Sequence, residues 1–141
     1  MPSCTFFGHR DCPSSIEAHL REVLIDLIEH KNINVFYVGN NGAFDKIVAR
    51  TLRDFKLIYT HISCFTVLAY LPQKDCDSEY NSTIFPEGIE NVPKRFAISW
   101  RNNWMLNRCE YTVTYITHSF GGASKFADKA RRSGKVVINL N

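Results

Sequence analysis

The chain has 141 residues, of which 45% are hydrophobic and 22% are charged, enough for one globular domain with a buried core. Its net charge of +3 permits a nucleic-acid partner without arguing for one, and no apolar run reaches the ~20 residues of a membrane span. The five cysteines are scattered and odd in number, and the N-terminus lacks a signal-peptide layout, so we expect a reduced, cytoplasmic setting.

The first predicted unit is a short strand followed by a helix. Cys4–Phe7 is apolar and stops at Gly8-His9-Arg10, which predicts a strand that ends in a turn. The apolar stripe of Ile16–Ile28 predicts a helix. Ser14 and Glu17 match a capping box at the start of that helix, in which each side chain bonds the other residue's backbone N–H.

The second predicted unit repeats this layout. Ile33–Val38 is a β-prone run that stops at the turn Gly39-Asn-Asn-Gly42. After Gly42 the apolar residues take helical spacing to about Tyr59. A third strand is predicted at Ser63–Leu71, where continuous hydrophobicity is typical of a parallel strand buried on both faces.

The second half is expected to be less regular before the pattern resumes. Gln73–Val92 is polar and is predicted to be a long loop with one helical turn. Pro93 suits the start of a helix that places Phe96, Trp100 and Trp104 on one face. More strands and a helix are then expected, in chain order Tyr111–Thr117 (strand), the glycine turn His118–Gly122, Ala123–Ala130 (helix) and Val136–Leu140 (strand).

Alternating strands and helices indicate an α/β domain with right-handed crossovers, spanning residues 1–141. We predict a Rossmann-like three-layer sandwich, with a five-stranded parallel sheet of order 3-2-1-4-5 and helices on both faces. In that order the topological switch falls between the first and fourth strands, where open α/β sheets bind ligands. Gly8-His9-Arg10 and His118–Ser124 are therefore expected to flank the binding site.

Three glycine turns at one end of the sheet are the main indication of function. Each turn can aim backbone N–H groups and a helix N-terminus at a phosphate or a carboxylate. The alternative is that the glycines only permit tight turns with positive φ. Neither the dinucleotide fingerprint G-x-G-x-x-G nor the P-loop pattern is present, so the usual phosphate-binding motifs are excluded.

Several side chains near these turns could carry binding or catalysis. Asp45 lies in the first turn of its helix, where it either complements the helix dipole or takes ribose hydroxyls. Arg10 and Arg101 are candidate cations for a phosphate. His9 and His118 follow predicted strand ends and are either acid–base groups or hydrogen-bonded turn residues.

Other features carry less functional weight. Trp100 and Trp104 are expected to be core residues rather than base-stacking platforms. Cys4, His9 and Cys12 are capable of binding metal, but no fourth ligand is evident and Cys4 is expected to be buried, so we expect no metal site. We expect no further cofactor.

The set of motifs resembles the SLOG superfamily, the Rossmann-like group that joins the Smf/DprA and Lonely Guy (LOG) proteins, and particularly its small bacterial members. The resemblance rests on Thr5–Arg10, Val38–Asp45, Arg101–Met105 and Gly121–Ser124 in this order. It implies a nucleotide-binding pocket. The residues that the motifs or their position place around that pocket are Gly8, His9, Arg10, Gly39, Asn40, Gly42, Asp45, Arg101, His118, Gly121, Gly122 and Ser124.

Three functions follow from the resemblance and from these residues. We favour the binding or sensing of a nucleotide or a nucleotide-derived ligand. The first alternative is a LOG-type hydrolase of nucleoside monophosphates, with Asp45, Arg101 and His9 as candidate catalytic residues. The glutamate of the LOG motif is absent here, because the matching turn has Ala127 after Ser119–Phe126, and Glu110 is expected at the wrong end of its strand.

The second alternative is a DprA-like nucleic-acid-binding module, which the modest charge permits but does not favour. We also consider a homodimer, because related folds pair through helices. Trp100 or Trp104 would lie at such an interface.

Overall fold

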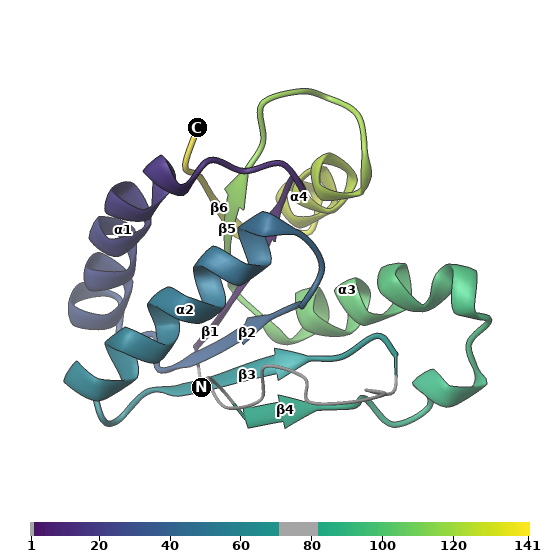
Figure 1. The fold of residues 1–141 in the computed structure, drawn as a ribbon, viewed down its shortest axis with the longest axis horizontal. Helices are drawn as coiled ribbons and strands as arrows, with labels where there is room; N and C mark the ends of the chain where they lie inside the picture. Colours follow the sequence, from purple (N-terminus) through teal and green to yellow (C-terminus); the bar gives the residue numbers. More distant parts are fainter. Residues whose placement is uncertain (1, 71–81) are drawn as a thin grey trace.

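A computed structural model describes residues 2–70 and 82–141 of the chain (Figure 1). Its strands are β1 (Ser3–Gly8), β2 (Val35–Val38), β3 (Ser63–Val67), β4 (Ser82–Ile84), β5 (Tyr111–Tyr115) and β6 (Val136–Asn139). Its helices are α1 (Glu17–His30), α2 (Ala43–Ile58), α3 (Ala97–Arg108) and α4 (Gly122–Arg132). Short 3-10 helices lie at Ser14–Ile16, Ile89–Asn91 and Lys94–Phe96.

The sheet has six strands in the order β4-β3-β2-β1-β5-β6, and every neighbouring pair is parallel. The predicted order of the five long strands is confirmed, but the predicted strand count of five was wrong. The additional strand β4 pairs Ser82 with Phe65 and Ile84 with Val67 at the edge of the sheet. The switch point lies where predicted, with β1 between β2 and β5.

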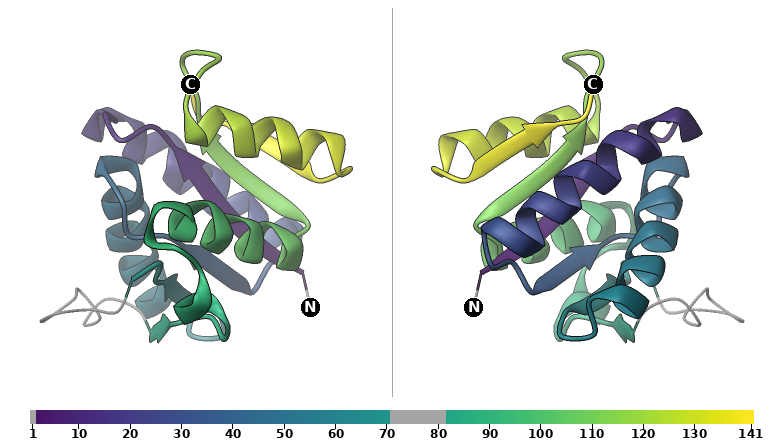
Figure 2. Two further views of the ribbon diagram at one scale, coloured as in Figure 1. Left: turned by 90° about the vertical axis from the view of Figure 1, so that its right-hand side faces the viewer. Right: turned by 90° about the vertical axis from the view of Figure 1, so that its left-hand side faces the viewer.

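Helices cover both faces of the sheet, as predicted, and give three layers (Figure 2). On one face α1 and α2 pack against the sheet through the largest core cluster, which includes Leu20, Phe36 and Leu52. On the other face α3 and α4 pack through a second cluster, which includes Met105 and Phe126. Because α2 follows β2 and α4 follows β5 in the chain, the N-termini of both helices lie at the carboxyl end of the sheet.

The first helix starts differently from the prediction. Ser14 begins a 3-10 turn and makes no capping hydrogen bond through its side chain. Glu17 accepts hydrogen bonds from Arg21 and Arg50 at 3.2 and 3.0 Å. The capping box was therefore wrong, because two arginines engage the carboxylate that would have capped the helix.

The region expected to be a long loop carries more structure than predicted. Its described part contains β4 and a 3-10 turn at Ile89–Asn91, which is the single helical turn expected there. The predicted strand Ser63–Leu71 extends as β3 only to Val67, and its last residue lies outside the described residues. Over residues 2–70 and 82–141, every helix is too short or too polar to cross a bilayer.

Candidate functional site

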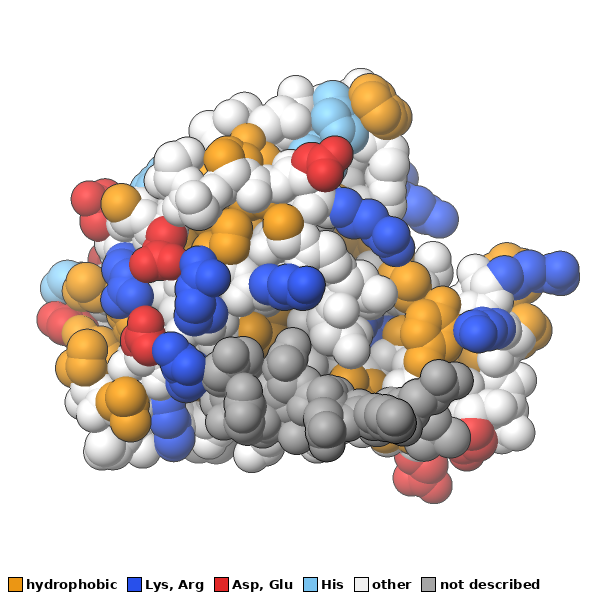
Figure 3. All heavy atoms as spheres, in the orientation of Figure 1, with side chains coloured by type: hydrophobic (Ala, Val, Ile, Leu, Met, Phe, Trp, Pro, Cys, Tyr) orange, Lys and Arg blue, Asp and Glu red, His pale blue; other side chains and the backbone are white. Residues whose placement is uncertain are grey.

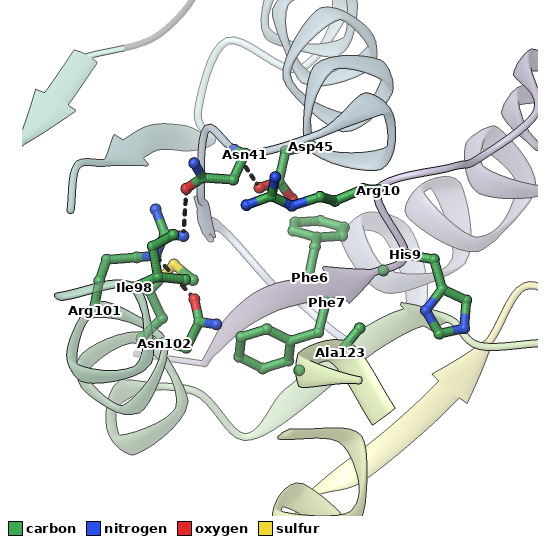
Figure 4. Close-up of a pocket in the computed structure, with 13 residues that line it drawn as sticks. Phe6, Phe7, His9, Arg10, Asn41, Asp45, Ile98, Arg101, Asn102 and Ala123 are labelled. Atoms are coloured by element: carbon green, nitrogen blue, oxygen red, sulfur yellow. Dashed lines mark hydrogen bonds between the residues drawn. The ribbon is translucent and has the colours of Figure 1, made fainter. Parts of the chain in front are cut away.

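A cavity of about 320 Å³ lies at the carboxyl end of the sheet, beside the switch point (Figure 4). The end of β1, the turn before α2, one face of α3 and the first turn of α4 all contribute to it. Its lining residues are Phe6, Phe7, Gly8, His9, Arg10, Asn41, Asp45, Ile98, Arg101, Asn102, Met105, Gly122 and Ala123. The floor is thus apolar and the walls carry amides, two arginines and one carboxyl group.

Arg101 is the most firmly held of these side chains. It is 2% exposed, and its guanidinium donates hydrogen bonds to the Val67 carbonyl oxygen at 2.9 Å and to the Asn102 side chain at 2.8 Å. It also donates to Asn41 Oδ1 at 2.9 Å and to Asn40 Oδ1 at 3.4 Å. A guanidinium has five N–H donors, so these four bonds leave one for any ligand.

Asp45 is the carboxyl group of the cavity and is 8% exposed. Its Oδ2 accepts a hydrogen bond from the backbone N–H of Asn41 at 2.9 Å. Burial raises the pKa of Asp45 from 3.8 to about 6, against the opposing effects of the Asn41 N–H and the charges of Arg101 and Arg10. Burial also lowers the pKa of Arg101, and the negative charge of Asp45 opposes that lowering.

Gly39 is the residue that allows Arg101 and Asp45 to lie so close to the backbone of the turn. A Cβ atom at this position would lie 2.9 Å from Arg101 Cζ and 2.9 Å from Asp45 Oδ2. These distances are shorter than any ordinary contact of a methyl group, so an alanine would displace one of the two groups. The absent side chain of Gly39 is therefore part of the geometry of the site.

Arg10 is the exposed cation of the cavity. Its backbone is fixed, because its carbonyl oxygen accepts a hydrogen bond from the Ala43 N–H at 2.9 Å. Gly42 has a φ of 95° and would place a Cβ atom 2.9 Å from Arg10 Cα. The Arg10 side chain extends over the cavity beside Asp45 (Figure 4), and the described residues hold no ion pair with it.

Three rings stack in a column at one edge of the cavity. The imidazoles of His9 and His118 lie 3.7 Å apart, and the ring of Phe120 lies 3.8 Å from that of His118. His9 Nε2 accepts a hydrogen bond from the Thr117 N–H at 3.0 Å, so this nitrogen carries no proton. Burial and the neighbouring His118 lower the pKa of His9, which favours the same neutral form.

The predicted site residues divide into two groups. Those that line the cavity are Gly8, His9, Arg10, Asp45, Arg101 and Gly122. The others surround it: Asn40 bonds Arg101, His118 stacks on His9, and Ser124 is buried in α4. Gly39 and Gly42 are the two ends of the turn before α2, and Gly121 precedes α4.

Seven lining residues were not predicted: Phe6, Phe7, Asn41, Ile98, Asn102, Met105 and Ala123. All of them except Ile98 lie within the four motif segments on which the resemblance rests, so their neighbourhood had a signal in the sequence. The role of the apolar ones as lining had no signal of its own, because core residues and lining residues share the same periodicity.

Other candidates lie away from the cavity or bind elsewhere. Glu110 lies at the opposite end of the sheet, as expected, where its Oε1 accepts a hydrogen bond from the Ser3 N–H at 2.8 Å. Cys4 is fully buried in β1, as expected. The described residues contain no cluster of three or more His, Cys, Asp or Glu side chains that could hold a metal ion.

The two tryptophans of α3 lie in mixed environments. Trp104 packs edge-on against Tyr37, with ring centroids 5.6 Å apart, and the Arg108 guanidinium lies 3.7 Å from the Trp104 ring centroid. Trp100 packs against a small cluster that includes Ile89. Both side chains are half-buried, so they are neither fully core nor free platforms.

The sheet order and the cavity at its switch point are those of a Rossmann-like α/β domain, and its fold is similar to that of two solved DNA processing protein A structures, as the resemblance implied. DNA processing protein A from Streptococcus pneumoniae matches 99% of this chain with a TM-score of 0.70 and 16% identity. DNA processing protein A from Helicobacter pylori matches 98% with a TM-score of 0.66 and 11% identity.

The chain spans 50% of the S. pneumoniae structure and 64% of the H. pylori structure. No family profile matches the sequence, and no curated protein matches it. The likeness therefore concerns the fold, and identities of 16% and 11% do not extend it to activity.

Proposed function

We propose that the cavity binds one nucleotide unit of a single-stranded DNA. The observation that carries this proposal is an exposed arginine, without an ion pair among the described residues, above an apolar floor. Arg10 lies beside Phe6 and Asp45 in Figure 4, and the apolar lining of the cavity is made by Phe6, Phe7, Ile98 and Met105. A phosphate binds an exposed arginine, and a nucleobase packs against an apolar surface.

The polar groups suit the remaining parts of a nucleotide. The first turn of α4 lines the cavity through Gly122 and Ala123, and its backbone N–H groups favour a phosphate near Arg10. The amide of Asn102 is on the opposite wall, where it can bond a base edge or the sugar. Asp45 is buried, and its negative charge would repel a phosphate. It is therefore better suited to accept hydrogen bonds from other parts of the nucleotide.

The comparisons support DNA over other sources of the nucleotide. The H. pylori structure was described for a single-stranded DNA binding mode, and its fold matches nearly all of this chain. On the face drawn in Figure 3, the surface is hollowed between α4 and the start of α3, with Lys and Arg side chains on both sides of the hollow. Cations on both sides of a hollow suit a backbone that continues beyond one nucleotide.

A free nucleotide or nucleotide-derived ligand is the second candidate. It is favoured by the size of the cavity, because about 320 Å³ is at the small end of ligand pockets and suits a single compact ligand. Hydrolysis of that ligand receives less support. Asp45 is the one acidic residue among those that line the cavity, and Glu110 lies at the other end of the sheet.

Fluorescence anisotropy with a labelled oligo-dT of about 12 nucleotides tests the proposal, within the ~4–16 nucleotides that a single binding fold covers. We expect binding at low salt, weakened roughly tenfold or more by Arg10→Gln because a charged phosphate contact is lost. Lys31→Gln, an exposed cation after the end of α1, is the matched control and should bind as the wild type does.

The competing functions give different results in the same assay. Competition by AMP or dTMP as strong as that by the oligonucleotide would support the free-nucleotide function instead. Absence of binding by both classes of ligand at low salt would refute the proposal. A homodimer stays a prediction, which sedimentation of the purified chain would check.

A further inference from the structure

A second hollow, of about 600 Å³, lies beside the cavity on the outer side of α4. It is lined by Ser119, Gly121, Lys125, Asp128, Arg131 and Arg132. Gly121 lines this hollow, and the next residue, Gly122, lines the first cavity. Both hollows therefore adjoin the start of α4.

The charge of the second hollow is positive and largely uncompensated. Arg131 pairs with Asp128 through a contact of 2.8 Å. Lys125 and Arg132 are exposed, and the described part of the chain provides neither of them with an ion pair. The net charge of the lining is therefore that of these two cations, which suits one or two phosphates.

An exposed aromatic ring ends the column that starts at the edge of the first cavity. Phe120 is 70% exposed, and it lies in the chain between Ser119 and Gly121, which both line the second hollow. One face of its ring stacks on His118, which stacks on His9 at the edge of the first cavity. The other face has no aromatic partner among the described residues. The column therefore presents a supported, flat, apolar surface to solvent.

We propose that Phe120 and the outer side of α4 form a second contact for the DNA strand, in which a base stacks on the Phe120 ring and its phosphates bind Lys125 and Arg132. This proposal rests on the proposed function, because the strand must occupy the first cavity for its next nucleotide to reach Phe120. Exposed aromatic faces beside cations are the usual means of holding single strands without sequence preference. An acidic protein segment would use the cations but leave the exposed ring in water.

The test compares variants with a short and a long ligand. The affinity of Phe120→Ala for an oligo-dT of about 12 nucleotides should be about tenfold lower than that of the wild type. This is the order of magnitude expected when one base–aromatic stack is lost. Lys125→Gln combined with Arg132→Gln should weaken the same oligonucleotide and lower the slope of log affinity against log salt by about 1–2. Phe120→Trp should restore the affinity. Leu57→Ala, which truncates a side chain that is 79% exposed on α2, is the matched control.

A direct readout of stacking uses an oligonucleotide that carries 2-aminopurine, whose fluorescence is quenched when the base stacks. Wild type and Phe120→Trp should quench it on binding, and Phe120→Ala should not. Binding of dTMP should be the same in all these variants, because the first cavity is intact.

The outcomes separate this inference from the function on which it rests. If Arg10→Gln loses the 12-mer while Phe120→Ala and the double variant bind within twofold of wild type, the second contact is wrong and the first cavity stands. If wild type binds no oligonucleotide and no mononucleotide, both proposals fail. If an acidic peptide competes as well as the 12-mer and Phe120→Ala has no effect on either, the outer side of α4 binds acidic protein and this inference is overturned.

Discussion

Replacing Asp45 by asparagine should make the folded protein more stable at neutral pH. Burial raises the pKa of Asp45 from 3.8 to about 6, which means that folding favours the neutral carboxyl over the charged one. The difference of roughly 2 pH units corresponds to about 3 kcal/mol at pH values well above 6. This figure already contains the attraction of Arg101 and Arg10, because both charges act on the same pKa.

The sign of the effect depends on pH in a defined window. Below pH 3.8 the carboxyl group is neutral in both states and contributes no pH dependence. As pH rises from 3.8 to about 6, the unfolded chain releases its proton more readily than the folded protein does, so the contribution of Asp45 to stability falls. Above that window the loss is complete. The amide introduced by Asp45→Asn has no such titration and keeps an oxygen that can accept the Asn41 N–H.

Urea unfolding at pH 4 and at pH 7.5 measures this difference. Asp45→Asn should match the wild type at pH 4 and exceed it by about 2–3 kcal/mol at pH 7.5, which raises the Tm by roughly 5–10 °C. Asp26→Asn is the control, because Asp26 is exposed and pairs only with His30 in the described residues; we expect a change within about 0.5 kcal/mol. Equal or lower stability of Asp45→Asn at both pH values would refute the reasoning, since the carboxylate would then stabilise the fold.

Further predictions concern the turn and the ring column. Gly39→Ala should destabilise the fold by about 1–3 kcal/mol and weaken ligand binding, because its methyl group displaces the Arg101 guanidinium; urea unfolding and anisotropy measure both effects. Gly122→Ala, with no atom within 4 Å of the added methyl group, should leave the protein as stable as wild type or more so. Burial lowers the pKa of His9 below 6.5, so the contribution of His9 to stability is present above pH 6.5 and should be lost as pH falls through the lower pKa of the folded protein. The Thr117 amide, which donates to His9, should then lose protection from hydrogen exchange, whereas protection that survives once the His9 imidazole is seen by NMR to be protonated would contradict the assignment.

The sequence predicted the central sheet well because its strands carry strong signals. β1 and β2 both end at glycine turns that lead toward a helix, and that pattern determines which ends of the strands meet. β4 was missed because it has three residues, two of them exposed, and follows a polar stretch. Its existence depends on pairing with β3, which no local pattern records.

Six of the residues expected at the site line the cavity, but their roles could not be assigned from the sequence. The position of Arg101 in a helix says nothing of its burial, which depends on oxygens contributed by Val67, Asn40 and Asn41. These residues lie 34 to 61 positions away in the chain. Arg10 and Arg101 therefore looked equivalent in sequence, and only packing separates an exposed cation from a buried one.

The four hydrogen bonds that hold Arg101 have a thermodynamic consequence for any ligand. Its guanidinium is fixed by four acceptors before a ligand arrives, so closing the cavity around a ligand need not restrict that side chain further. Immobilising a long side chain costs about 0.5–1.5 kcal/mol on binding, and here folding has already met that cost. The wall formed by α3 and the second glycine turn should thus be superimposable in free and bound states, and the rearrangement on binding should be confined to Arg10.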